Sequence, residues 1–248
     1  YFKFLKCAYW HLPKIDQSRA NKKIKLFITV CGQKGGVAKT CTSIHLASVW
    51  HSEGKKVCIV DADKNRSALA YGNRGNLPFP IFPVSSAAKA SRSFDIVITD
   101  GQASSDEEEL KHLAYGSDLV LIPTTPKARS VELTVELASL LSAQKVNHAV
   151  LIVKVDSRKQ KAAKQADIAL NKFGLKVFNE YIPLLSAFDK AEASGNAVFE
   201  AVDDLGRADP RRMTGWSSYC SIASQIQCLI SKHSLNSNSS NNQNLRIA

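Results

Sequence analysis

Lysines, glycines and a threonine fill a short stretch of the chain whose residue types suit the binding of phosphate groups. Residues 33–40 read Gln-Lys-Gly-Gly-Val-Ala-Lys-Thr, between an apolar run and a helical pattern. That setting is the one a phosphate-binding loop requires. Glycine-rich backbone turns its N–H groups towards phosphate oxygens, and a helix N-terminus adds partial positive charge. The candidate binding residues are Lys34, Gly35, Gly36, Val37, Ala38, Lys39, Thr40 and Cys41.

The loop differs from the common phosphate-loop pattern GxxxxGK[ST]. Gln33 and Ala38 occupy its two glycine positions, and Lys34 is an additional lysine. The remaining pattern is KGGxxK[ST]. We expect Lys39 to reach the β- and γ-phosphates of a nucleotide and the Thr40 hydroxyl to ligate Mg²⁺.

Three aspartates end apolar runs downstream of the loop. Asp61 and Asp63 belong to Val-Asp-Ala-Asp (60–63), and Asp100 ends Phe-Asp-Ile-Val-Ile-Thr-Asp (94–100). Taken alone, each is compatible with a solvated residue at a strand end. Its place in the series after the loop makes Asp100 a candidate for a metal site, because carboxylate oxygens suit Mg²⁺.

Short apolar runs alternate with helical patterns, and this alternation predicts the element order. Strands are expected at 25–31, 56–61, 94–100, 118–123, 148–154 and 176–182, and helices near 39–53, 105–115, 129–146, 158–173, 187–201 and 214–230. The strands are apolar on both faces, which is typical of a buried parallel sheet. The predicted fold is α/β, a doubly wound and mostly parallel sheet with helices on both faces. Residues 71–93 are expected to form a loop with at most one short strand. Ligands bind beyond the carboxyl ends of such strands, where the motifs above fall.

The KGGxxK[ST] loop resembles the deviant Walker A motif of the ParA/MinD ATPases, and the resemblance covers about residues 25–230. Asp63 follows Lys39 by 24 residues and matches the family's DxD, while 94–101 is similar to its Walker B strand. Residues 117–126 and 195–204 are similar to later segments, the second of them typical of short, ParF-like ParA proteins. The resemblance implies a P-loop NTPase fold with ATP or ADP and Mg²⁺ as cofactors.

The resemblance also implies roles for individual residues. In this family two subunits sandwich ATP, so Lys34 is expected to contact phosphates bound by the partner and Asp63 to orient the attacking water. The implied catalytic residues are Lys34, Lys39 and Asp63, and the implied metal residues are Thr40, Asp61 and Asp100. Residues 100–109 would form a switch that senses the γ-phosphate. Turnover is expected to be slow and stimulated by a partner protein.

Three positions depart from the family pattern. Ala38 stands where glycine is commoner, so a left-handed backbone there would be strained. Cys41 replaces a hydroxyl residue, and Lys64-Asn65 replaces the common Pro-Gln. A protein that binds nucleotide and hydrolyses it poorly therefore remains an alternative.

The formal net charge is +11, which favours an anionic partner. Residues 1–25 hold seven basic residues and one acidic residue, so more than half of the excess lies there. The candidate DNA-binding residues form two local clusters, with a solvated helix face as the alternative. They are Arg158, Lys161 and Lys164 in the first cluster, and Arg207, Arg211 and Arg212 in the second.

Several classes of protein are disfavoured. No apolar run approaches the roughly 18 residues that a membrane helix needs, and the Asn/Ser-rich tail lacks a basic amphipathic helix. The spacing of the six cysteines fits neither a zinc site nor an iron–sulfur cluster, and a reducing compartment suits them. Residues 1–24 are expected to be a basic extension, 25–230 the ATPase domain and 231–248 a disordered tail.

The sequence therefore predicts a cytoplasmic partition ATPase of ParA type. It would dimerise on ATP, bind DNA non-specifically and so associate with the nucleoid, and position plasmid or chromosomal DNA. A small centromere-binding or cargo-bound adaptor would stimulate hydrolysis, and no membrane partner is expected. A ParA-like ATPase that positions a protein compartment is the first alternative. An ATP-dependent metabolic ligase is less favoured, because the sequence offers no motif for a small-acid pocket.

Overall fold

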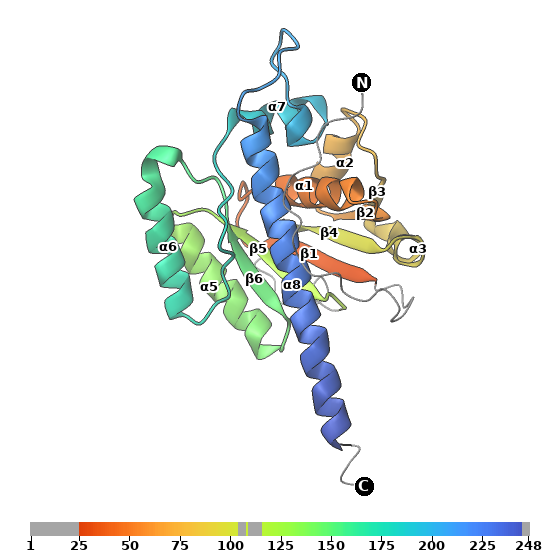
Figure 1. Ribbon diagram of the computed structural model, residues 1–248, viewed down its shortest axis with the longest axis vertical. Helices are drawn as coiled ribbons and strands as arrows, with labels where there is room; N and C mark the ends of the chain where they lie inside the picture. Colours follow the sequence, from red (N-terminus) through yellow and green to blue (C-terminus); the bar gives the residue numbers. More distant parts are fainter. Residues whose placement is uncertain (1–24, 104–107, 109–115, 245–248) are drawn as a thin grey trace, which may run out of the picture.

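A six-stranded sheet with only parallel pairings forms the centre of the protein (Figure 1). The computed structural model describes residues 25–103, 108 and 116–244. The strand order is β3-β2-β4-β1-β5-β6. The strands are β1 (Leu26–Gly32), β2 (Val57–Ala62), β3 (Ile81–Pro83), β4 (Ile96–Ala103), β5 (Leu119–Thr124) and β6 (His148–Ile152). The predicted α/β class with a parallel sheet is confirmed.

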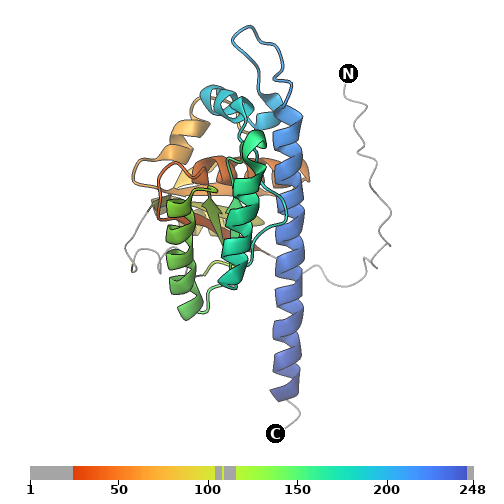
Figure 2. The ribbon, with the colours of Figure 1, turned by 90° about the vertical axis from the view of Figure 1, so that its left-hand side faces the viewer.

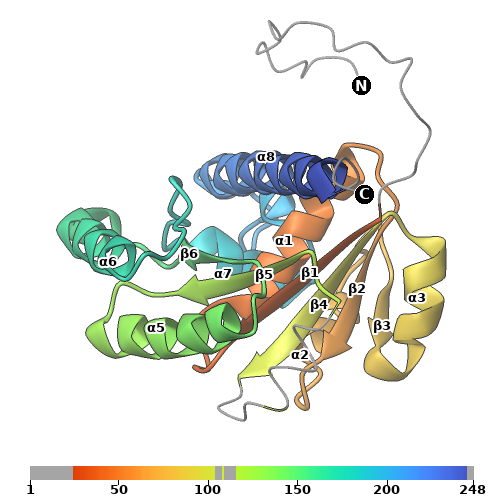
Figure 3. The ribbon, with the colours of Figure 1, turned by 90° about the horizontal axis from the view of Figure 1, so that it is seen from below.

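Helices cover both faces of the sheet (Figure 3). They are α1 (Lys39–Ser52), α2 (Ser67–Gly72), α3 (Ala87–Ser93), α5 (Ala128–Ala143), α6 (Gln160–Lys172), α7 (Ser186–Ser194) and α8 (Arg212–Asn244). Three single 3₁₀ turns, η1 (Val84–Ser86), η2 (Ser157–Lys159) and η3 (Val198–Glu200), complete the elements. Helices α1 and α8 lie on one face, and α3 and α5 on the other.

Alternation along the strands creates the two cores. Leu119 and Leu121 belong to the core that α1 and α8 close, whereas Val120 and Ile122 belong to the core that α5 and α6 close. Successive side chains of a strand point to opposite faces, so a strand apolar at every position feeds both cores. Cys31 is a buried free thiol in the second of these cores, and Cys58 is one in a smaller cluster with Val60 and Val97, as expected for cysteines in apolar runs.

The prediction of a sixth strand at 176–182 is wrong. This segment runs beside β6 but makes only two isolated parallel bridges there, Val150 with Val177 and Val155 with Pro183. Between them the backbone leaves the ladder, because the amide of Asn179 donates to Gln225 of α8 instead. The sixth strand is β3, within the segment that we expect to be a loop with at most one short strand.

Two of the predicted helices have a different outcome. The helix near 105–115 lies outside the described residues except for Glu108. The helix predicted at 187–201 ends at Gly195, which adopts a left-handed φ of 65°, and η3 follows as a separate turn. Gly195 is suited to this position because it lacks a Cβ.

Helix α8 continues to Asn244, well past residue 230 (Figure 2). The sequence predicts a disordered tail from residue 231, so the structure differs from this expectation. Once a helix is nucleated, each added residue gains one backbone hydrogen bond, which favours continuation. No helix among the described residues is both long and apolar enough to cross a membrane.

Candidate nucleotide-binding site

The phosphate loop lies at the carboxyl edge of the sheet, between the end of β1 at Gly32 and the start of α1 at Lys39. Strand β1 lies between β4 and β5, with β2 and β3 on one side of it and β6 on the other. The loop after β1 therefore lies where the strand order changes direction, which is where ligands bind in such sheets. Gly36 and Ala38 both adopt a left-handed backbone, with φ of 75° and 60°. For Ala38 this conformation costs about 1 kcal/mol, because its Cβ crowds the following carbonyl.

The Lys39 side chain is held against the loop itself. It is 8% exposed, and its Nζ donates to the carbonyl oxygen of Lys34 at 3.1 Å. Burial lowers the pKa of Lys39, while the nearby carboxylates of Asp100 and Asp63 raise it. A phosphate oxygen in the loop would offer this ammonium group a charged acceptor in place of a neutral carbonyl, which is a stronger interaction.

Asp100 is fully buried at the end of β4 and binds two hydroxyl groups of α1. Thr40 Oγ1 donates to Asp100 Oδ2 at 2.7 Å, and Ser43 Oγ donates to Asp100 Oδ1 at 2.9 Å. Burial raises the pKa of Asp100 to about 7, against the lowering effect of these two hydrogen bonds. The hydroxyl of Thr40 and the carboxylate of Asp100 are hard oxygen ligands, so the donor set fits Mg²⁺.

Asp61 and Asp63 organise the turn after β2. Asp61 accepts hydrogen bonds from the amides of Asp63 at 3.0 Å and Leu69 at 2.8 Å, and its Cα pairs with Asp100 across the sheet. Asp63 accepts from the amide of Asn65 and the hydroxyl of Ser67. Of these two carboxylates, only Asp63 lines the cavity described next. Among the described residues no cluster of three or more His, Cys, Asp or Glu side chains can hold a metal ion by itself.

A cavity of about 560 Å³ opens beside the loop. Loop residues and Asp63 line it, and so do residues of the segment before and within α7: Ile182, Pro183, Leu184, Leu185, Phe188, Asp189 and Glu192. The loop contributes polar and cationic groups, whereas residues 182–188 contribute an apolar wall and α7 adds two carboxylates. A site of this size and character suits a phosphorylated nucleoside, with phosphates at the loop and the base against the apolar wall.

The sequence analysis does not single out this apolar wall. Residues 182–188 follow the segment expected to be a strand, and their only signal is that they come at its carboxyl end. Phe188 packs edge to face against Tyr219 of α8 at 5.8 Å between centroids, so α8 reaches the site as well.

His45 of α1 contacts Tyr219, which lines the cavity, and forms a hydrogen bond with Val198. It is fully buried, stacks on Tyr219 at 5.1 Å and lies four residues after Cys41 in α1. Its Nδ1 lies 2.6 Å from the Cys41 carbonyl oxygen, and its Nε2 accepts from the amide of Val198 at 3.0 Å. This pairing requires a neutral ring with the proton on Nδ1, and burial lowers the pKa of His45 to about 4.

Two other predicted loop residues have clear environments. Lys34 does not line the 560 Å³ cavity, and its carbonyl oxygen rather than its amine meets Lys39. Burial raises the pKa of the Cys41 thiol to about 12, so this cysteine is a neutral packing group.

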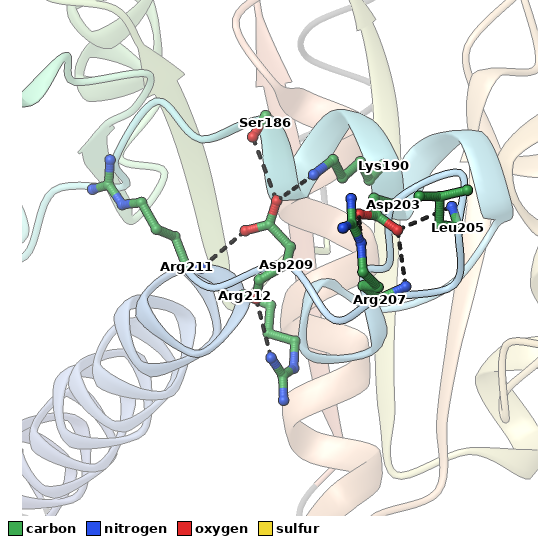
Figure 4. A network of polar contacts seen from close by, with 8 residues as sticks. All are labelled: Ser186, Lys190, Asp203, Leu205, Arg207, Asp209, Arg211 and Arg212. Carbon is green, nitrogen blue, oxygen red and sulfur yellow. Dashed lines mark hydrogen bonds and ion pairs between the residues drawn. The ribbon is translucent and has the colours of Figure 1, made fainter.

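The two predicted DNA-binding clusters differ in how their side chains are engaged. Lys161 and Lys164 are exposed on α6, and the 86% exposed side chain of Arg158 pairs with Asp156 at 3.0 Å. In the second cluster Arg207 pairs with Asp203 at 2.7 Å, and Arg212 donates to the carbonyl of Asp209 (Figure 4).

The second cluster therefore contributes to local structure. The carboxylate of Asp209 also binds Lys190 at 2.7 Å and the amide of Arg211, which joins α7 to the start of α8 (Figure 4). The guanidinium of Arg211 points away from this network in Figure 4.

Comparison with known proteins identifies the family. The family model described as the CobQ/CobB/MinD/ParA nucleotide binding domain matches residues 28–198, which is more than half of the chain. The chain belongs to this family. The resemblance to ParA and MinD proteins is thus confirmed.

Individual members of the CobQ/CobB/MinD/ParA family match most of the chain. Maintenance of carboxysome distribution protein A of Gloeobacter kilaueensis is 27% identical over 183 residues, which cover 70% of this chain and 83% of that protein. The AMPPNP-bound structure of a putative plasmid partition protein from Borrelia burgdorferi is 17% identical, with a TM-score of 0.63, covering 82% of this chain and 99% of that one. MinD of Pyrococcus horikoshii, complexed with Mg-ADP, is 14% identical, with a TM-score of 0.62, covering 83% and 97%.

Proposed function

We propose that the protein is an ATPase of ParA type that binds ATP with Mg²⁺ and uses its hydrolysis to control association with DNA. The observation that carries the proposal is the convergence of Lys39, Thr40 and Asp63 on one 560 Å³ cavity. The family is a nucleotide-binding one, and its members named above include complexes with AMPPNP and with Mg-ADP. These observations support ATP, ADP and Mg²⁺ as the cofactors.

Each site residue then has a task in phosphoryl transfer, which depends mainly on positioning and on neutralisation of charge. The amides of Gly35 and Gly36 and the ammonium group of Lys39 hold the phosphates. Thr40 and Asp100 would hold Mg²⁺, which would supply positive charge at the phosphates, and Asp61 would support that site through the turn after β2. Asp63 lines the cavity and orients the attacking water.

Lys34 acts between subunits in this proposal. It does not line the cavity that would bind the nucleotide of its own chain, which is compatible with contact between its ammonium group and phosphates bound by a second copy. ATP would thereby favour a homodimer. The exposed lysines Lys161 and Lys164 on α6 would bind DNA phosphates without reading base sequence.

The cargo is plasmid or chromosomal DNA, reached through a small centromere-binding or cargo-bound adaptor that stimulates a slow ATPase. The partition protein of Borrelia burgdorferi supports this choice by its fold. The carboxysome distribution protein favours a second candidate, in which the cargo is a protein compartment. In either case the protein would be cytoplasmic and associated with the nucleoid when bound to ATP.

DNA retardation in three nucleotide states tests the proposal. The full chain should retard non-specific duplex DNA with ATP and Mg²⁺, and weakly or not at all with ADP or without nucleotide. Lys34→Ala should lose the ATP-dependent retardation while retaining ATP binding, and Lys55→Ala, which changes an exposed lysine of the α1–β2 turn, should behave as wild type. Equal DNA binding in all three states would contradict the nucleotide switch.

A further inference from the structure

A second cavity lies on the other side of the phosphate loop. Its volume is about 510 Å³, and it is bounded by the loop, the β5–α5 connection and the segment between β6 and α6. Gly35, Gly36, Lys154 and Leu184 line both cavities, so the two cavities adjoin along the loop. The polar residues around the second cavity are Lys34, Thr125, Lys127, Lys154, Asp156 and Lys159.

Positive charge dominates this cavity. Four of its lining residues are lysines, and among the described residues no ion pair engages any of their ammonium groups. The single carboxylate, that of Asp156, already accepts hydrogen bonds from Arg158 Nε and Nη2. A concave surface with several cations and one neutralised acid concentrates anions.

Two helix N-termini add to this field. Lys127 and Lys159 are the N-cap residues of α5 and α6, and neither helix has an acidic residue in its first turn. A cation at a helix N-terminus opposes the helix dipole, whereas an anion there is stabilising. Each helix N-terminus therefore carries a lysine next to the positive end of the helix dipole, with no acidic residue in the first turn to neutralise them. An anion bound between the two N-termini would neutralise both positive charges.

A buried hydroxyl at the same place has no hydrogen-bond partner within residues 25–103, 108 and 116–244. Thr125 lines the cavity and is 8% exposed, and its Oγ1 is this unpartnered group, whereas its amide donates to Ser130 Oγ at 3.2 Å. A buried hydroxyl without a partner costs about 1 to 3 kcal/mol, so such groups are uncommon unless a ligand completes them.

Lys154 joins the two cavities. It lines both, and its backbone is left-handed, with φ of 56°, directly after β6. A non-glycine residue in this conformation is strained, and strain of this kind clusters at binding sites. Lys154 therefore contributes a lysine to both cavities.

We propose that the second cavity binds a small polyphosphate anion, separately from the nucleotide at the first cavity. The ammonium groups of Lys127 and Lys159 would contact its phosphate oxygens together with Lys34, and the hydroxyl of Thr125 would donate to one of them. Bound there, the anion neutralises Lys34 and so opposes contact between two copies of the chain. The assignment stands on the cavity and its charges, and it does not depend on DNA binding.

Calorimetric titration of inorganic pyrophosphate tests this site. The full chain is first saturated with ADP in magnesium-free buffer, so that the first cavity is occupied. One equivalent of pyrophosphate should then bind to wild type, and at least about tenfold more weakly to the double variant Lys127→Gln/Lys159→Gln, which loses two charge-assisted contacts. Lys55→Gln is the matched control and should bind pyrophosphate within twofold of wild type.

Further variants distinguish this site from the first. Lys39→Ala should weaken ADP binding while leaving pyrophosphate affinity within about twofold in the same buffer. Thr125→Val should weaken pyrophosphate binding several-fold without lowering the melting temperature, and Thr125→Ser, which restores a hydroxyl, should recover it. The double variant should still retard DNA with ATP.

Three results would overturn the assignment. One is the absence of pyrophosphate binding under saturating ADP, and another is equal pyrophosphate affinity in wild type, the double variant and Thr125→Val. The third is a pyrophosphate signal that appears only with an ATP analogue and grows with protein concentration, since the cavity would then belong to an interface between two copies.

Discussion

Thr40 and Asp100 are joined by a hydrogen bond of 2.7 Å, which ties the first turn of α1 to the carboxyl-terminal half of β4. The two residues are 60 positions apart in the chain, and the strand order brings them together because β1 and β4 are neighbours. A ligand that engages Thr40 therefore also acts on the strand that leads into residues 100–109.

Removal of the Lys39 ammonium group should weaken ATP binding strongly. Lys39→Ala deletes the one buried cation in the loop, and the loss of a charged hydrogen bond to phosphate is expected to cost about 1.5 to 3 kcal/mol, or about tenfold or more in affinity. Fluorescent ATP-analogue binding measures this effect. Lys55→Ala serves as the control and should keep wild-type affinity.

Asp100→Asn should stabilise the protein in the absence of nucleotide while abolishing the magnesium dependence of nucleotide binding. The pKa of Asp100 is raised from 3.8 to about 7, so above pH 7 the folded state contains a costly buried charge. The substitution should raise the free energy of unfolding by up to about 4 kcal/mol at pH 8. Urea denaturation should show this gain shrinking as the pH falls from about 7 towards 4, and a gain independent of pH would contradict the assigned cause.

Ala38→Gly should stabilise the loop. Ala38 is left-handed with φ of 60°, so removing its Cβ should raise the free energy of unfolding by up to about 1 kcal/mol. Ala169→Gly changes an alanine within regular helix α6 and should lower it by about 1 kcal/mol. Urea denaturation measures both changes in the free energy of unfolding. They should have opposite signs if the left-handed backbone of Ala38 is strained, and the same sign if it is not.

His45 should make the protein sensitive to mild acid. Its pKa is lowered from 6.5 to about 4, so the unfolded state binds more protons than the folded state between these values. Stability should therefore fall as the pH drops from about 6.5 to 4, by about 3 kcal/mol from this residue alone. His45→Gln keeps one donor and one acceptor and should lose this part of the pH dependence, which denaturation curves at pH 7, 6, 5 and 4.5 would reveal.

Charge reversal on α6 should reduce both the affinity for DNA and its salt dependence. Lys161→Glu/Lys164→Glu removes two exposed cations, and each lost phosphate contact should lower the slope of log affinity against log salt by about 1. Arg207→Gln is the comparison, because Arg207 is engaged by Asp203 and should affect the slope little. Retardation at four salt concentrations measures the slopes, and an unchanged slope in the α6 variant would place the DNA site elsewhere.

Periodicity and motif spacing predict the centre of the fold well. Strands β1, β2, β4 and β5 are short apolar runs that end in motif residues, and each lies where the sequence predicts it. The register that pairs Asp61 with Asp100 follows from the alignment of parallel strands at one edge. These features are local in sequence or follow from sheet geometry.

Features that depend on contacts distant in sequence could not be predicted in the same way. The segment 176–182 has the composition of a strand, yet the contact of Asn179 with Gln225, 46 residues away, draws it off the ladder. The apolar wall of the cavity likewise depends on how the segment before α7 packs against α8. The pairing of Arg207 with Asp203 spans only four residues, but it forms in a loop that periodicity does not predict. A charge count treats Arg207 and Lys161 alike, whereas the structure pairs Arg207 with Asp203 and leaves Lys161 exposed.

The two hydrogen bonds of the buried His45 ring have a mechanical consequence. One bond holds the carbonyl of Cys41, at the start of the phosphate-loop helix, and the other holds the amide of Val198, in the segment that leads to α8. The rigid ring therefore fixes the distance between α1 and Val198, which are joined through residues 153 positions apart in the chain. A displacement of α1 along its axis must either carry Val198 with it or break the hydrogen bond between the Val198 amide and the ring.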